Sequence, residues 1–354
     1  MNTKLWKICL HRTIFVLMSL AILAGCAGPA ASATSVSAQP GKLVLGAYST
    51  PQEAYKELLP LFAKDWLAKS GQTITFEESY QGSGAQARAI VQGFEADIAA
   101  LSLEADINTI QQAKLITSDW KNTPTKGMVS DSVVAFAVRP GNPKHILDWS
   151  DLAQPGLQIL TPNVKTSGGA MWNILAIYGA AMRGYVKGVA ANDDAAARTF
   201  LVAVLKNVTV MDKDARTSIT NFETGVGDVA ITYESEVLLG QQSGQKYDLV
   251  IPTSTILIEN PVALVDTYVD KHGSRAAAEG FLQFLVTPEA QQIFAKYGYR
   301  PVEKTTAEAM KATFKQVQDL FTIDYFGGWS KATPQFFGDG GVYDQLINAA
   351  QGSK

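Results

Sequence analysis

The sequence predicts an α/β fold with two lobes, each a mainly parallel sheet flanked by helices, joined by two crossing segments. Short apolar runs alternate with segments whose apolar residues recur at helical spacing, a pattern typical of parallel sheets covered by helices. Two stretches rich in Pro and Gly interrupt this alternation and indicate where the chain crosses between lobes. The length of 354 residues is enough for two domains.

The first 25 residues have the layout of an export signal. Three basic residues precede an apolar stretch at 14–23 that is too short to span a bilayer as a stable helix. The stretch runs into Leu23-Ala24-Gly25-Cys26, which resembles a bacterial lipobox. We therefore expect a lipoprotein signal peptide at 1–25 and lipidation of Cys26. Ordinary signal cleavage after Ala33 remains an alternative.

A stretch of mostly Ala, Ser, Pro and Gly follows at 26–42 and is expected to be a flexible tether. The only cysteines, Cys9 and Cys26, lie in the processing region, so the mature chain has no internal disulfide. Removal of the signal takes away three positive charges and lowers the formal net charge from −3 to −6. A mildly acidic chain without a basic stripe argues against nucleic acid as a partner.

The body of the chain begins with a β-α-β pattern. An apolar run at 43–48 precedes a segment at 55–66 with helical spacing, and a second strand is predicted at 73–76. Further strands are predicted at 97–101, 133–138, 158–160, 228–233, 249–251 and 261–265.

The two crossing segments are predicted at 138–143 and 252–261, where strand-like runs meet Pro and Gly. Residues 43–138 and 253–354 would then form the first lobe, and residues 139–252 the second. Two lobes joined in this way leave a cleft, which is the usual place for a ligand and a hinge.

Three short motifs of small residues stand at predicted helix starts: residues 81–84, 166–169 and 214–218. A helix start has unpaired N–H donors and a partial charge of about +0.5, so it favours an anion without a lysine. Each motif alone has a simpler interpretation as an N-cap or a turn. Three of them converging would supply about +1.5, most of what a dianion needs.

Several stretches resemble the sulfate- and thiosulfate-binding proteins of ABC importers, which have the periplasmic-binding-protein fold. The resemblance covers nearly all of the chain from about residue 43 to 346. The stretches that carry it are 81–90 with 93–97, 139–144 with 148–152, 166–170, 227–229, 299–301 and 320–329. The resemblance implies a protein of two lobes that closes on a buried oxyanion, sulfate or thiosulfate, held by neutral donors. It also implies an extracytoplasmic location, a membrane permease as partner and a monomeric state.

The resemblance also implies which residues bind the anion. Ser83 would donate its hydroxyl and amide, and Ser167, Gly168 and Gly169 would donate a hydroxyl and amides from the second lobe. Ala215 matches a position that gives a backbone amide.

Some positions depart from the family pattern. Tyr233 stands where members often have Trp, and a phenol O–H can replace the indole N–H as donor. Ser49 lies in the loop after the first strand, where many members have Asp. Met171 stands where many members have Arg, and we expect its side chain to lie in the core. Asp214 replaces a Gly and is expected to cap its helix, and Arg216 is expected to lie behind the site.

An enzyme would need an activated nucleophile, a metal set or a paired acid and base. The mature chain has two histidines, His145 and His272, both expected in exposed loops, so few such sets can form. We therefore expect no catalysis, no cofactor and no metal. A binder of molybdate or phosphate, a sensor lipoprotein, and a hydrolase using Ser83 or Ser167 remain as alternatives.

Overall fold

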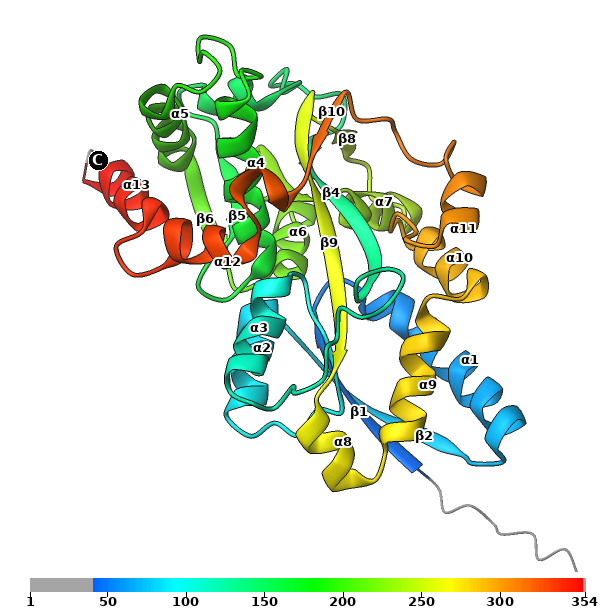
Figure 1. Cartoon of the computed structure of the whole chain (residues 1–354). Coiled ribbons are helices and arrows are strands. Elements are labelled where there is room, and N and C mark those ends of the chain that lie inside the picture. The colour runs from blue at the N-terminus through cyan, green and yellow to red at the C-terminus, as the bar shows by residue number, and fades with distance from the viewer. Residues whose placement is uncertain (1–40, 353–354) are drawn as a thin grey trace, which may run out of the picture. The chain divides into compact units, whose positions relative to one another are not determined.

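Within residues 41–352, ten strands form one mixed sheet (Figure 1). The computed structural model describes residues 41–352, so the predicted signal peptide, Cys26 and the tether up to residue 40 lie outside it. The strands are β1 (Gly41–Tyr48), β2 (Ile74–Gln81), β3 (Ile98–Ala100), β4 (Met128–Val138), β5 (Ile159–Pro162), β6 (Val208–Asp212), β7 (Val229–Tyr233), β8 (Asp248–Val250), β9 (Ser254–Leu264) and β10 (Asp319–Phe321). Their order is β2-β1-β3-β9-β4-β7-β5-β6, with β10 beside β9 and β8 beside β4. The predicted α/β fold is confirmed, although the sequence did not indicate β6 or β10.

The first lobe is built on β2, β1 and β3, which are parallel to one another. This pairing confirms the β-α-β unit predicted at its start. The connecting helix buries Tyr55, Leu58 and Phe62 against the sheet and ends at Gly71, whose φ of 73° is the left-handed conformation that glycine favours. The helices of this part of the chain are α1 (Gln52–Ser70), α2 (Ser83–Val91), α3 (Glu104–Gln112), α8 (Asp266–His272), α9 (Arg275–Leu285), α10 (Pro288–Lys296) and α11 (Lys304–Ala309).

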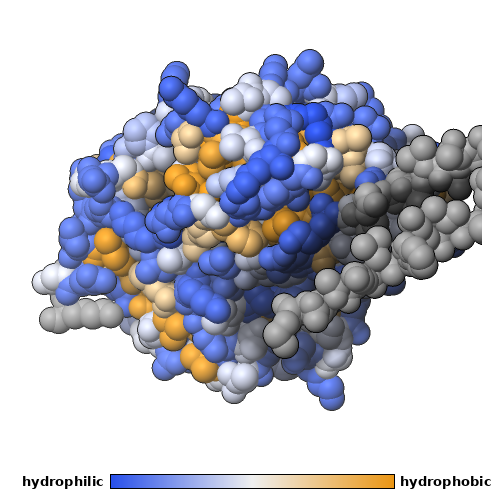
Figure 2. All heavy atoms as spheres, turned by 90° about the horizontal axis from the view of Figure 1, so that it is seen from below, coloured by the Kyte–Doolittle hydropathy of each residue, from blue (hydrophilic) through white to orange (hydrophobic). Residues whose placement is uncertain are grey.

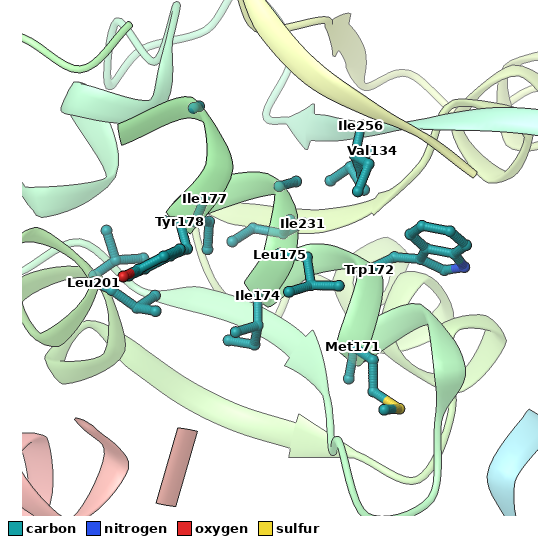
Figure 3. Packing of buried hydrophobic residues seen from close by; sticks show 14 of the residues in the cluster. Val134, Met171, Trp172, Ile174, Leu175, Ile177, Tyr178, Leu201, Ile231 and Ile256 are labelled. Carbon is teal, nitrogen blue, oxygen red and sulfur yellow. The ribbon is translucent and has the colours of Figure 1, made fainter. Parts of the chain in front are cut away.

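The second lobe is built on β7, β5 and β6, also parallel, with α4 (Gly168–Met182), α5 (Asp194–Lys206), α6 (Ala215–Glu223) and α7 (Glu234–Gln242). Helix α4 is apolar on nearly all faces, and such a helix must be covered on all sides. Figure 3 shows Trp172, Ile174 and Leu175 of this helix in the buried cluster. Met171 belongs to the same cluster, which confirms the predicted core side chain.

The two lobes are joined by the long central strands β4 and β9. Residues 128–133 of β4 pair with β9, and residues 134–138 of the same strand pair with β7. Strand β9 likewise pairs with β10, then β4, then β3 along its length. The first crossing therefore lies inside β4 rather than at 138–143. The Pro/Gly turn there marks the end of the strand, where Arg139 donates to the carbonyl of Gly227 in the second lobe.

The C-terminal segment packs with the second lobe, which differs from the predicted division of the chain. It contains β10, α12 (Trp329–Ala332) and α13 (Val342–Gln351). Trp329, Phe336 and Leu346 share the buried cluster of α4 and α5. The rings of Trp172 and Trp329 meet edge to face with centroids 4.7 Å apart. The apolar side chains of this segment thus cover α4, which explains why that helix is apolar all round.

The surface of the described part carries both hydrophobic and hydrophilic residues (Figure 2). Figure 2 shows hydrophobic residues in patches among hydrophilic ones on the face seen from below. Within residues 41–352, no helix combines the length and the apolar character needed to cross a membrane.

Candidate functional site

The three helix starts singled out in the sequence meet between the lobes. The N–H of Ala85 in α2 donates to the carbonyl oxygen of Thr166 over 3.1 Å. The hydroxyl of Thr166, just before α4, donates to the carbonyl oxygen of Lys213, just before α6, over 2.7 Å. A Cβ added to Gly82 would overlap the Thr166 carbonyl oxygen, so only glycine lets the lobes approach this closely here.

Several backbone N–H groups at these helix starts have no acceptor among residues 41–352. They include those of Ser83, Gly84, Gly168, Gly169 and Ala215. N–H groups of this kind, at the positive ends of helix dipoles, form a ready-made site for an anion. Together with Ser49, Ser167, Tyr233 and Arg216 we refer to these residues as the candidate site.

Ser83 is buried, and its hydroxyl is already engaged by the protein. Its Oγ donates to Asp106 Oδ2 over 2.5 Å and accepts from the N–H of Ser102 over 2.9 Å. The hydroxyl proton is therefore not free for an anion, in contrast to the expectation from the resemblance. The backbone N–H of Ser83 remains open.

Asp106 is a buried acid that the sequence did not single out. Burial raises the pKa of Asp106 to about 6, against the opposing effects of the Ser83 hydrogen bond and the charge of Arg88. Asp106 lies on α3, and its carboxyl fixes the orientation of the Ser83 hydroxyl through this hydrogen bond.

Ser167, Gly168 and Gly169 form the start of α4. Ser167 is buried, and its hydroxyl makes no hydrogen bond within the described residues. A Cβ on Gly168 would come within 2.8 Å of the Ser102 hydroxyl, and one on Gly169 within 2.8 Å of the Tyr233 ring. The two glycines therefore let polar groups of both lobes approach the open N–H groups of this helix.

Tyr233 ends β7 and is fully buried, with its hydroxyl oxygen 2.6 Å from Ser102 Oγ. Burial is the largest of the effects that raise the pKa of Tyr233 above its ordinary value. The phenol therefore stays protonated at neutral pH and is available as a neutral donor.

Asp214 caps α6, as the sequence predicts. Its Oδ1 accepts from the N–H of Thr217 over 2.8 Å. The carboxylate is thus engaged by its own helix, while the N–H of Ala215 stays open.

Arg216 is bound on three sides by protein groups. Its guanidinium pairs with Glu236 and Glu53 and donates to the carbonyl oxygen of Thr50, next to Ser49. Burial opposes the charged form, but the Glu236 carboxylate raises the pKa of Arg216 above its usual range. Arg216 therefore holds the loop after β1 in the first lobe to α6 in the second.

Ser49 is also buried, and its side chain makes no hydrogen bond within residues 41–352. The structure thus brings Ser49, Ser83, Ser167, Ala215 and Tyr233 into one region between the lobes, with Arg216 behind it.

Sequence reasoning missed Ser102, Asp106, Trp172 and Asn260, which hold the site together. Trp172 Nε1 and Asn260 Nδ2 both donate to the carbonyl oxygen of Ser102, over 3.0 and 3.1 Å. No motif or spacing marks these residues, because they are distant from one another along the chain.

Other features of the described residues lie apart from this site. No group of three or more His, Cys, Asp or Glu in the described range could hold a metal. His145 is exposed, and the ring of His272, at the end of α8, contacts Asp97 and Glu95. A mainly apolar cavity of about 560 Å³ is lined by residues including Trp120, Met128, Val262, Leu282 and Val286.

The chain is similar to proteins of known function over most of its length. The family of bacterial extracellular solute-binding proteins matches residues 43–300. A sulfate-binding protein of Synechococcus elongatus is 45% identical over 332 residues, covering 93% of each chain. A thiosulfate-binding protein of Escherichia coli is 35% identical over 319 residues, covering 88% of this chain and 93% of that protein. The solved structure of the sulfate-binding protein SubI of Mycobacterium tuberculosis is 34% identical, with a TM-score of 0.77 over 84% of this chain and 99% of that chain.

Proposed function

Because the chain belongs to the bacterial extracellular solute-binding proteins, we propose that it captures sulfate or thiosulfate outside the cytoplasm for an ABC importer. The observation that carries the proposal is the meeting of three helix starts, each with at least one N–H group that has no acceptor within residues 41–352. The names of the relatives support the same class of ligand. The chain would hand its ligand to the membrane permease of that importer and would act as a monomer, without catalysis.

The chemistry of the donors supports an anion that carries no proton. The three helix starts supply about +1.5 of partial charge, and the neighbouring side chains are neutral hydroxyls. Arg216 does not add a free charge, because Glu236 and Glu53 neutralise it. Sulfate needs donors only, whereas protonated phosphate also needs an acceptor. Asp214 is engaged as a cap and Asp106 as the acceptor of Ser83, so neither is free for a ligand proton.

Titration calorimetry with sulfate, thiosulfate, molybdate and phosphate at pH 6 and pH 8 tests the proposal. We expect tight binding of sulfate or thiosulfate and weak competition by phosphate. Molybdate also needs donors only. Comparing its affinity with those of sulfate and thiosulfate therefore decides whether the site prefers a sulfur oxyanion or molybdate. Tight binding of phosphate together with absent binding of sulfate would overturn the assignment of ligand.

We further propose that the chain is anchored to the membrane through a lipid on Cys26. The lipobox-like Leu23-Ala24-Gly25-Cys26 and the absence of other cysteines from the mature chain support this. Replacement of Cys26 by Ser should release the protein from membranes or block its processing, with ligand binding intact. Labelled lipid incorporation measures the anchor, and an unlabelled wild type would favour cleavage after Ala33.

A further inference from the structure

Ser102, which follows β3, is buried and has all of its polar groups paired. Its N–H donates to Ser83 Oγ over 2.9 Å, and its hydroxyl lies 2.6 Å from that of Tyr233. Its carbonyl oxygen accepts from Trp172 Nε1 over 3.0 Å and from Asn260 Nδ2 over 3.1 Å. A buried residue with this many partners fixes the positions of the groups that it contacts.

The partners of Ser102 come from several of the elements that border the candidate site. Ser83 begins α2 in the first lobe, Trp172 and Tyr233 belong to α4 and β7 in the second, and Asn260 lies on the crossing strand β9. One residue therefore connects both lobes and a strand that joins them.

The pair of hydroxyls has one O–H to spare. Ser102 and Tyr233 carry one hydroxyl proton each, and the bond between them uses only one of the two. Neither hydroxyl makes another hydrogen bond among residues 41–352. Tyr233 keeps its proton because burial raises its pKa. The pair can thus always donate one O–H to a third group.

That spare donor lies at the start of α4. A Cβ on Gly169 would be 3.1 Å from the Tyr233 hydroxyl oxygen, and one on Gly168 would be 2.8 Å from Ser102 Oγ. The backbone N–H groups of both glycines are open within the described chain. The hydroxyl pair and the helix start therefore present their donors to the same place.

We propose that Ser102 is a positioning residue for the oxyanion: it orients the Tyr233 hydroxyl so that the pair donates one O–H beside the N–H groups of α4. This inference rests on the proposed function. An indole N–H has a fixed direction, whereas a phenol O–H rotates about its C–O bond. A tyrosine donor therefore needs a partner that fixes the direction of its proton, and Ser102 supplies that partner.

A double-mutant cycle on the mature protein tests the inference, with sulfate titrated calorimetrically into wild type, Ser102→Ala, Tyr233→Phe and the double variant. Ser102→Ala should weaken sulfate binding about 10-fold, the loss expected for one hydrogen bond to a charged ligand. In the Tyr233→Phe background the same change should cost less than about 2-fold, because the hydroxyl that Ser102 orients is already gone. A residue that acted only through the fold would give losses that multiply.

Ser274→Ala is the matched control. Its hydroxyl is also partly buried and donates to a carboxylate, Asp97, at the other end of the first-lobe sheet. This variant should bind sulfate as the wild type does.

The outcomes separate the inference from the proposed function. Unchanged affinity of Ser102→Ala, or losses that multiply in the double variant, would overturn the role of Ser102 while leaving sulfate binding in place. A wild type that binds no oxyanion would overturn the proposed function and this inference together. If Ser102→Ala does not fold, Tyr233→Phe still decides, since wild-type affinity in that variant would exclude an O–H donated by Tyr233 and would overturn the role of Ser102 with it.

Discussion

The guanidinium of Arg216 makes two hydrogen bonds to the buried carboxylate of Glu236, from Nε to Oε2 over 2.7 Å and from Nη2 to Oε1 over 2.8 Å. The same guanidinium reaches the Thr50 carbonyl oxygen of the first lobe over 2.8 Å. This ion pair is therefore part of the contact between the lobes as well as of the second lobe.

Replacement of Arg216 by Met should lower the free energy of unfolding by about 3–5 kcal/mol, because it leaves the Glu236 charge buried without a partner. Urea denaturation measures the loss. Arg198→Met is the matched control, since Arg198 pairs with Asp194 on the surface of α5 and such pairs contribute about 0.5 kcal/mol. Equal losses in the two variants would contradict the structural role of Arg216.

Gly82→Ala should weaken sulfate binding by about 1–3 kcal/mol, because its Cβ would collide with the Thr166 carbonyl oxygen when the lobes approach. The φ of −59° at Gly82 is open to alanine, so the substitution strains only the contact between lobes. Small-angle scattering with sulfate should show a less compact shape than the wild type.

Gly280→Ala serves as its control. A Cβ there would come within 2.5 Å of the Trp66 ring inside the first lobe, away from the contact between the lobes. If both variants bind equally well, the close approach at Gly82 does not matter for the ligand.

Ser167→Ala should weaken sulfate binding by about 1–3 kcal/mol, because the residue is buried and its hydroxyl makes no hydrogen bond in the described protein and is free to donate to a charged ligand. Ser83→Ala should lose less affinity, since the Ser83 proton already goes to Asp106. Calorimetry on both variants checks the order, and a larger loss for Ser83 would show that its hydroxyl turns toward the ligand.

Asp106 should make the stability of the unliganded protein fall as pH rises from about 4 to about 6. Its pKa is about 6 in the folded protein, above its ordinary value of 3.8, so the folded state holds more protons than the unfolded state in this window. The difference corresponds to at most about 3 kcal/mol. Asp106→Asn should reduce the slope measured by urea denaturation at pH 4.5, 6 and 8, whereas exposed Asp339→Asn should leave it in place.

The sequence by itself determined the local features of this protein. Apolar residues at helical spacing predicted the helix that contains Tyr55 and Phe62, and small residues at 81–84, 166–169 and 214–218 predicted three helix starts. These signals are local, since spacing, caps and turns depend on residues within a few positions of one another. The resemblance of these motifs to a known family then indicated the ligand class.

Only the tertiary structure decided which groups surround the site. Ser102 and Asn260 are 158 positions apart, and Trp172 and Tyr233 reach Ser102 from the other lobe. It also decided that the crossing lies inside β4 and that Trp329 covers α4. The residues next to a single serine or tryptophan in the sequence do not reveal which distant residues it will contact. Such contacts arise from the packing of whole helices and strands and not from sequence spacing.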